Sequence, residues 1–340
     1  MNEIVNDAPA VPVQVLTAAN FKSSYKPIWC PGCGDYTVLS SVTKALAIMG
    51  VPPKDCAVVS GIGCSSRIPA YTTCYGFHGV HGRSLAAATG LKVARPDLQV
   101  LVAGGDGDGY SIGGNHFLHA CRRNVDMTYL VMDNHVYGMT KGQPSPTTEP
   151  DWDSKLSPGG TGVRVFNPPV VALASGANFV ARAFAGDLHG TADIIAKAMQ
   201  HPGFSFVEIL SPCVTFRPEQ RDWRKLVRAA VVPSTDDAGR AARRLMTDDG
   251  LNIGILYAGN RAPYQASVRA AGCSVPNWKR SLPYESDQQQ RSRQAAGHTA
   301  GLHGAGAADG TRRCRALQRI CRHDGNPQQP GGGAVVSQDG

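Results

Sequence analysis

The chain has 340 residues, of which 42% are apolar and 18% are charged. This composition can bury a substantial core in one large or two ordinary domains, and it excludes a disordered or fibrous chain over most of the length. No uncharged apolar run approaches about 18 residues, so we expect no membrane-spanning helix. Residues 1–20 lack a basic segment followed by an apolar run. Ten cysteines without such a signal predict a reducing compartment, the cytoplasm.

The net charge of +8 is concentrated at the C-terminus. Residues 261–340 hold 11 Lys and Arg against 5 Asp and Glu, which leaves only +2 for the first 260 residues. This segment is rich in Gln, Gly and Ala and lacks periodic large apolar residues. We interpret it as a low-complexity basic tail, with a frameshifted reading frame favoured over a genuine disordered extension. The body has no basic stripe with interleaved aromatics, so nucleic-acid binding is not expected.

Apolar runs alternate with helical patterns through the body. The expected strands are 56–60, 98–103, 127–132 and 204–210, and the expected helices are 36–49, 83–94, 111–122 and 191–199, with Ser111 as a helix N-cap and Val170–Ser175 as a further apolar element. Strands that are apolar on both faces and are separated by helices predict an α/β fold with a doubly wound, mostly parallel sheet. Ligands bind such sheets at the carboxyl ends of the strands. We place the domain at residues 20–260, after an N-terminal extension at 1–19.

A glycine-rich acidic turn follows the strand predicted at 98–103. Asp106 stands between two glycines there, and Asn134 follows the next predicted strand. Mg²⁺ prefers hard oxygen ligands, which the Asp106 carboxylate, the Asn134 amide and the Val136 carbonyl can supply. The flanking glycines let a diphosphate approach the backbone. A Gly-Asp turn that merely closes a strand is the simpler interpretation of the tripeptide alone, but the spacing to Asn134 favours a metal–diphosphate site.

Four cysteines form a second candidate site. Cys30 and Cys33 stand in a Cys-x-x-Cys loop, and Cys64 and Cys213 lie in loops at strand ends. The pair alone is compatible with half a zinc site, a redox pair or two bystanders. No second Cys-x-x-Cys completes a zinc ribbon, so a four-cysteine iron–sulfur cluster is modestly favoured over zinc. The cysteines in or beside apolar elements are expected to be small buried hydrophobes: Cys56, Cys74 and Cys121.

Several segments together resemble one family. They are Trp29–Tyr36, Gly61–Arg67, His78–Arg83, Gly104–Phe117 and Asp133–Gly142. In order and content they resemble the beta subunit of 2-oxoacid:ferredoxin oxidoreductases, which use thiamine diphosphate. The resemblance covers roughly residues 20–230, implies the diphosphate-domain fold of thiamine diphosphate enzymes, and is nearest to the members that use 2-oxoglutarate.

The resemblance also implies roles for individual residues. The 4Fe–4S ligands are Cys30, Cys33, Cys64 and Cys213, and the Mg²⁺ ligands are Asp106, Asn134 and the Val136 carbonyl. The thiamine diphosphate contacts are Ile62, Gly63, Cys64, Ser65, His81, Gly105, Asp106, Gly107, Asp108, Gly138 and Met139. His81 and Lys141 are placed at the reacting centre, with Lys141 helping to hold the 2-oxoacid carboxylate. Without the surrounding motifs, a satisfied loop histidine and a solvated charge are the simpler interpretations of these two residues.

The implied activity is oxidative decarboxylation of a 2-oxoacid, 2-oxoglutarate in particular, with coenzyme A as acyl acceptor. Electrons leave through the cluster to ferredoxin. The glutamate that activates the cofactor comes, in this family, from an alpha subunit, so we expect a heterodimer or heterotetramer that is inactive without that partner. Two alternatives stay open on the residues alone. One is a non-catalytic zinc or iron–sulfur protein, and the other is a thiamine diphosphate enzyme of the acetolactate synthase type.

Overall fold

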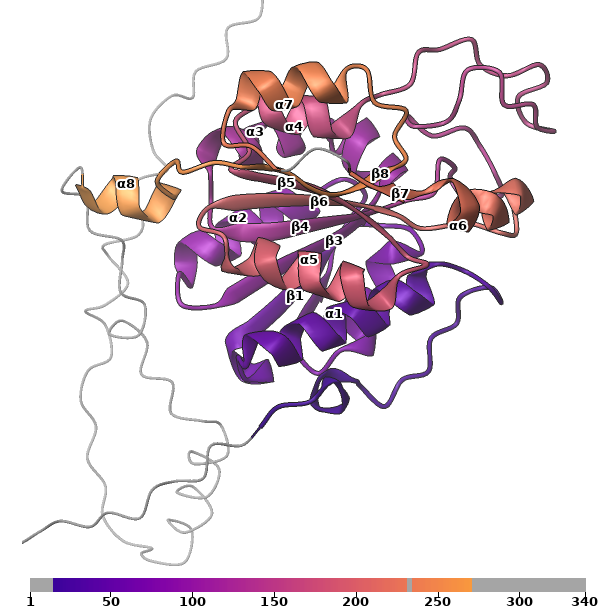
Figure 1. Cartoon of the computed structure of the whole chain (residues 1–340). Coiled ribbons are helices and arrows are strands. Elements are labelled where there is room, and N and C mark those ends of the chain that lie inside the picture. The colour runs from indigo at the N-terminus through magenta and orange to yellow at the C-terminus, as the bar shows by residue number, and fades with distance from the viewer. Residues whose placement is uncertain (1–14, 231–233, 271–340) are drawn as a thin grey trace, which may run out of the picture. The chain divides into compact units, whose positions relative to one another are not determined.

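An eight-stranded sheet forms the centre of the molecule (Figure 1). The computed structural model describes residues 15–230 and 234–270. The strands are β1 (Cys56–Ser60), β2 (Tyr75–His78), β3 (Gln99–Gly105), β4 (Met127–Asp133), β5 (Phe179–Phe184), β6 (Phe204–Leu210), β7 (Arg228–Ala229) and β8 (Asn252–Ala258). Their order is β2-β1-β3-β4-β6-β5-β8-β7, and every pair is parallel except β5 with β8. This confirms the predicted α/β fold with a mostly parallel sheet.

Helices cover both faces of the sheet (Figure 1). Helices α1 (Asp35–Met49) and α5 (Leu188–Gln200) pack on one face. The other face is covered by α2 (Ser84–Ala94), α3 (Gly114–Arg123), α4 (Pro168–Ala174) and α7 (Ala238–Leu245). The short helices α6 (Trp223–Leu226) and α8 (Tyr264–Ala270) complete the set in the described part of the chain. None of these helices is both long and apolar enough to cross a bilayer.

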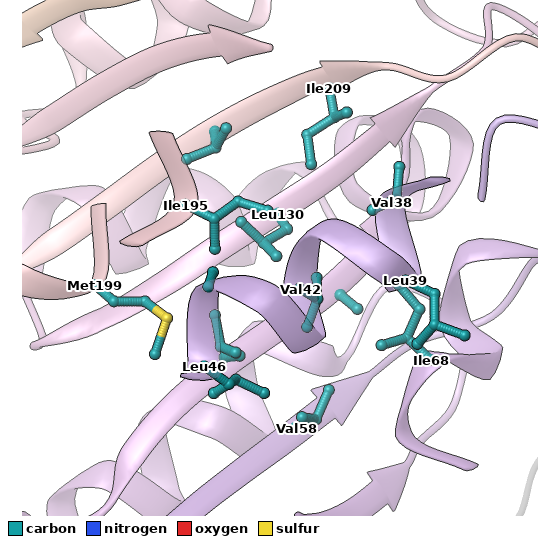
Figure 2. Close-up of a cluster of buried hydrophobic side chains, with 14 of the residues drawn as sticks. Val38, Leu39, Val42, Leu46, Val58, Ile68, Leu130, Ile195, Met199 and Ile209 are labelled. Carbon is teal, nitrogen blue, oxygen red and sulfur yellow. The ribbon is translucent and has the colours of Figure 1, made fainter. Parts of the chain in front are cut away.

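The central strands of the sheet, β1, β3, β4, β5 and β6, are buried on both faces, as the apolar runs predicted for all of them except β5. The edge strands β2 and β7 are exposed. Figure 2 shows the core under α1 and α5, where Val42 and Leu46 lie with Ile195 near Leu130 of β4. The next residue of β4, Val131, points into the opposite core. Truncating one of these fully buried side chains to alanine costs about 2–5 kcal/mol in proteins of this kind. This packing makes the sheet a rigid base for the loops at its edge.

Strand register brings four loops to one edge. Gly105 pairs with Met132, and Asp133 pairs with Leu210, so β3, β4 and β6 end at the same level. On the other side, Ser60 pairs with Ala103, so β1 ends at this edge as well. The loops that follow these strands begin at residues 61, 106, 134 and 211. They carry most of the predicted site residues, whereas Cys30, Cys33 and His81 come from other loops and Gly105 ends β3.

Some predicted elements differ from the structure. Ser111 is not an N-cap, because the chain passes from β3 straight into a π-helical turn, Gly107–Ile112, and α3 begins at Gly114. Strands β2, β5, β7 and β8 were not predicted, and the apolar element at 170–175 belongs to α4. The described fold also continues past 260, because the Arg261 guanidinium donates hydrogen bonds to the carbonyls of Cys121 and Gly176. Residues 1–14 and 271–340, which include most of the predicted extension and tail, lie outside the described residues.

Candidate functional site

A cavity of about 140 Å³ opens at the carboxyl edge of the sheet. It is lined by residues from the loops after β1, β3 and β4 and by His81. All the predicted cofactor contacts and all three predicted magnesium ligands line it: Ile62, Gly63, Cys64, Ser65, His81, Gly105, Asp106, Gly107, Asp108, Gly138, Met139, Asn134 and Val136. Residues separated by up to 77 positions in the sequence therefore meet at one place.

Asp108 organises the wall of this cavity. One oxygen of its buried carboxylate accepts hydrogen bonds from the Ile62 amide at 2.9 Å and the Gly82 amide at 2.7 Å. The same oxygen lies 2.7 Å from Nδ1 of His81. A Cβ on Gly61 would come within 2.0 Å of this carboxylate, so a glycine is required there. Asp108 thus ties the loop after β1 to the loop that carries His81.

The cavity has the features of a cradle for an anionic cofactor. Gly107 lies so close to the ring of Tyr137 that a Cβ would be 2.1 Å from it, and Tyr137 donates a hydrogen bond to the Gly107 carbonyl at 3.2 Å. Two buried oxygens of residues that line the cavity, Oγ of Ser65 and Oδ2 of Asp108, have no hydrogen-bond partner in the described structure. Buried polar atoms are normally paired, so these two fit a bound polar group.

The predicted magnesium ligands stand at the ends of neighbouring strands. Burial, reinforced by the neighbouring Asp133, raises the pKa of Asp106 to about 7. The Thr147 hydroxyl lies 2.7 Å from a carboxylate oxygen of Asp133 and 3.1 Å from a carboxylate oxygen of Asp106, and it donates its single hydrogen to one of them. The Asn134 side-chain oxygen accepts from the Val136 amide at 3.1 Å, which leaves it a second lone pair. A cation would relieve the charge repulsion between the two buried carboxylates, so the oxygen set suits Mg²⁺.

Lys141 does not line the cavity. Its side chain is exposed, and its backbone has a φ of 86°, which is rare for a residue with a side chain. The adjacent Met139 and Thr140 do line the cavity. The predicted contact between Lys141 and a substrate carboxylate therefore stays a prediction, and in this chain alone the lysine is at the rim.

The four predicted cluster cysteines come together from three loops. Cys64 and Cys213 act electrostatically on Cys33, and Cys30 acts on both Cys64 and Cys213. Burial raises the pKa of Cys33 and Cys213, and it raises that of Cys64 to about 11, with Asp35 adding to each effect. Cys30 is exposed and the other three are half-buried. Because burial raises the pKa of Cys33, Cys64 and Cys213, thiolate ligation by these three residues would be stabilised by the positive charge of a bound metal.

Among residues 15–230 and 234–270, no three His, Cys, Asp or Glu side chains are grouped as ligands of one metal ion. A structural zinc site needs four ligands around a single ion. In a 4Fe–4S cluster each thiolate binds a different iron, so its ligands stand farther apart. The choice between zinc and a cluster on these cysteines therefore stays a prediction.

Asp35 lies between the two constellations and was missed as a site residue. It lines the cavity, follows Cys33 by two positions, and accepts a 2.8 Å hydrogen bond from Ser211. Burial, with a contribution from Asp106, raises the pKa of Asp35 to about 6. Its position directly after the Cys-x-x-Cys loop was the available signal, although a carboxylate beginning a helix is usually only a capping residue.

A second, larger cavity of about 450 Å³ adjoins the first and shares Ile62, Gly63 and Met139 with it. Its lining includes the cationic side chains of Lys26 and Arg67. Arg67 lies in the 3-10 helix Ser65–Tyr71, three residues after Cys64. These two side chains give the second cavity a positive charge, which is compatible with an anionic ligand.

Comparisons with known proteins agree with this geometry. The family model of the C-terminal, thiamine pyrophosphate-binding domain of thiamine pyrophosphate enzymes matches residues 61–209. Subunit KorB of the 2-oxoglutarate oxidoreductase of Mycobacterium tuberculosis is 48% identical over 197 residues, which cover 58% of this chain and 53% of that protein. The beta subunit of a 2-oxoacid:ferredoxin oxidoreductase from Sulfolobus sp is 38% identical over 260 residues, 71% of this chain and 85% of that protein.

A solved structure is similar over most of the chain. The 2-oxoglutarate:ferredoxin oxidoreductase from Magnetococcus marinus, with 2-oxoglutarate, coenzyme A and succinyl-CoA bound, superposes with a TM-score of 0.72 at 39% identity. The match covers 82% of this chain and 96% of that chain. Fold and cavity thus define a thiamine diphosphate-binding α/β domain. The chain belongs to the family of beta subunits of 2-oxoacid:ferredoxin oxidoreductases, which confirms the resemblance seen in its motifs.

Proposed function

We propose that the chain is the beta subunit of an enzyme that oxidatively decarboxylates 2-oxoglutarate with coenzyme A to an acyl-CoA and CO₂. Two electrons pass through a 4Fe–4S cluster on Cys30, Cys33, Cys64 and Cys213 to ferredoxin. The observation that carries the proposal is the double position of Cys64, which lines the cofactor cavity and belongs to the cysteine group. A decarboxylation coupled to one-electron transfer needs an acceptor this close to the reacting centre. The cytoplasm is the proposed compartment.

The residues that line the cavity indicate which side chains would bind the cofactor. Thiamine diphosphate, when bound, supplies a carbon nucleophile that allows the bond beside a 2-oxo carbon to break. Asp106, Asn134 and the Val136 carbonyl would hold Mg²⁺, and the glycines at 105 and 107 would admit the diphosphate. Asp108 keeps the Ile62 and His81 loops in place. His81 can then exchange a proton with a group in the cavity through its second ring nitrogen.

The substrate assignment is supported by charge. KorB of M. tuberculosis and the M. marinus enzyme are both named for 2-oxoglutarate. A 2-oxo dicarboxylate carries a second carboxylate, and Arg67 and Lys26 place positive charge in the adjoining cavity. Lys141, at the rim, would hold the carboxylate beside the oxo group once the partner chain closes the site.

An alpha subunit is needed to complete the site. Of the residues that line the cavity in the described part of the chain, none is a glutamate. Large apolar side chains stand exposed in and beside the two cavities: Ile28 and Met139 line them, and Phe77 and Val80 are the sequence neighbours of the cavity-lining His78 and His81. An exposed apolar surface of this kind indicates a protein interface.

The electron acceptor has a separate approach. A third cavity, of about 430 Å³, is lined by Cys33 and by the exposed arginines Arg221 and Arg224. Positive charge beside a cluster ligand suits docking of an acidic electron carrier such as ferredoxin.

Anaerobic co-expression with the alpha chain tests the proposal. The purified complex should contain about four irons per beta chain and thiamine diphosphate, and it should reduce methyl viologen only when 2-oxoglutarate and coenzyme A are both present. Stoichiometric zinc without iron would favour the non-catalytic alternative. Activity that needs no coenzyme A and no cluster would favour an enzyme of the acetolactate synthase type.

A further inference from the structure

One buried side chain links the cysteine site to the metal–diphosphate loop. Gln220 is only 1% exposed. Its Oε1 accepts a hydrogen bond from the backbone amide of Cys213 at 2.8 Å, and its Nε2 donates one to the backbone carbonyl of Asn134 at 2.7 Å. Cys213 and Asn134 are separated by 79 positions in the sequence and stand after different strands, β6 and β4. A single amide therefore spans the two loops.

The chemistry of this bridge is specific to an amide. The Asn134 carbonyl needs a donor and the Cys213 amide needs an acceptor, and a side-chain amide offers one of each, so the two partners fix the orientation of the Gln220 side chain. A carboxylate has acceptors alone, and an apolar side chain has neither. Because both partners are backbone groups, the bridge sets the position of the two loops relative to each other.

A second connection reinforces the first. The backbone amide of Arg217 donates to the Cys213 carbonyl at 2.8 Å, and its Nη1 donates to the His135 carbonyl at 3.1 Å. The Arg217 guanidinium is itself held, 4.4 Å above the Trp152 ring and in an ion pair with Glu149 at 2.8 Å. The turn at 217–220 thus binds two consecutive backbone carbonyls, those of Asn134 and His135, and is also hydrogen-bonded to the backbone of Cys213.

We propose that Gln220 is a positioning residue that fixes the cysteine site relative to the magnesium–diphosphate site. The inference rests on the proposed function, since both sites are defined there. Gln220 contacts neither predicted group and acts through the backbone of Cys213 and Asn134. Loss of the bridge should disturb the cysteine site and the magnesium–diphosphate site together. Substitution of a residue that only stabilises the fold should lower the stability of the protein without a specific effect on either site.

A matched variant exists at the opposite edge of the sheet. Asn178 precedes β5 and is 2% exposed. Its Nδ2 donates to the Pro202 carbonyl at 2.8 Å, and its Oδ1 accepts from the Arg261 amide at 3.0 Å. This amide makes the same two kinds of bond away from the cavity. Gln220→Met and Asn178→Leu each remove a buried amide bridge and keep the approximate size of the side chain.

The test uses the anaerobically purified alpha–beta complex. Both variants should lower the unfolding temperature. Only Gln220→Met should weaken thiamine diphosphate binding in MgCl₂ roughly tenfold, as expected for one lost buried hydrogen bond, and change the electron paramagnetic resonance spectrum of the reduced cluster. Gln220→Glu, which keeps the acceptor for Cys213 but opposes the Asn134 carbonyl, should weaken cofactor binding similarly and provides a second folded variant.

Two results would overturn the inference. One is cofactor affinity and a cluster spectrum in both Gln220 variants that match the wild-type complex. The other is the same change in Asn178→Leu, because that would make the effect one of general stability. A wild-type complex with neither iron nor thiamine diphosphate would instead contradict the proposed function, and the inference with it.

Discussion

Gly138 lies against the sulfur of Cys213, so that a Cβ on the glycine would be 3.5 Å from it. Gly138 lines the cofactor cavity, and Cys213 belongs to the cysteine group. The cavity wall therefore touches the cysteine site at a second point besides Cys64. A Cβ at 138 would make an ordinary van der Waals contact with this sulfur. The two sites share a boundary rather than being linked by a distant path.

The cysteine site can be tested by substitution. Cys30→Ser and Cys213→Ser should each lose most of the bound iron and its broad visible absorption, because a hydroxyl is a poor replacement for a thiolate ligand. Cys121→Ser is the control, since Cys121 is fully buried in the core under α3. Iron content and the visible spectrum of the anaerobic complex are the measurements. Unchanged iron in Cys213→Ser would remove this residue from the ligand set.

The two acidic residues of the glycine-rich turn should behave differently. Asp106→Ala should abolish Mg²⁺-dependent binding of thiamine diphosphate, because it removes the only charged oxygen proposed for the metal. Asp108→Asn should instead weaken binding at any Mg²⁺ concentration, since its carboxylate orders the Ile62 and Gly82 amides. Titrating Mg²⁺ at fixed cofactor separates the two effects. Normal binding by Asp106→Ala would make Asp108 the candidate ligand.

Most of the site could be predicted because its residues are contiguous in short motifs at strand ends. Two of these motifs stand at the ends of strands that are apolar on both faces, at residues 105–108 and 134–139. Neighbouring parallel strands place their carboxyl ends at the same edge of the sheet, so the two motifs are expected to lie close together. Gln220 gave no such signal, because its role depends on a hydrogen bond to a backbone group 86 positions away. The charge of Arg67 was visible, but the cavity it lines depends on tertiary packing.

Strands β5 and β8 were not predicted, because their hydrophobic patterns do not show that they belong to the sheet. β5 contains Arg182, which is buried through ion pairs with Glu208 of β6 and Asp248 at 2.6 Å each. A charged residue in a short apolar run argues against a central strand until its partners are known. β8 runs antiparallel beside β5, with the pairing shifted between Val180 and Ala181. Neither partner choice nor strand direction can be derived from local periodicity.

Acid should destabilise the loop around His135 through Glu149. Burial opposes ionisation of this carboxyl, but the hydrogen bond and charge of His135, with Arg217, lower the pKa of Glu149 to about 2. A lowered pKa in the folded state contributes stability above the ordinary value of 4.5, and that stability is lost as the pH falls toward 2. Glu149→Gln should therefore unfold more easily at pH 7 and depend less on pH between about 5 and 3. Equal slopes in thermal unfolding would contradict this.

The arginines beside Cys33 should govern the reaction with ferredoxin. Arg221→Glu with Arg224→Glu should lower kcat/KM for ferredoxin by roughly ten- to a hundredfold at low salt, and less at high salt, because surface charge mainly steers association. Reduction of methyl viologen, which needs no docking, should be unchanged. Arg240→Glu with Arg243→Glu, on the exposed side of α7, is the matched control. Equal losses in both pairs would assign the effect to net charge alone.

Two cations are proposed for the two carboxylates of the substrate, and substrate length should separate them. Lys141→Ala should raise KM for 2-oxoglutarate and pyruvate alike, by roughly ten- to a hundredfold, the value of a charge-assisted hydrogen bond. Arg67→Ala should raise KM for 2-oxoglutarate far more than for pyruvate, which lacks the distal carboxylate. KM for coenzyme A should stay constant in Lys141→Ala. Steady-state kinetics of the alpha–beta complex at saturating ferredoxin measure all three. Unchanged oxoacid kinetics in Lys141→Ala would leave this exposed lysine as a solvated charge and assign that carboxylate to the alpha chain.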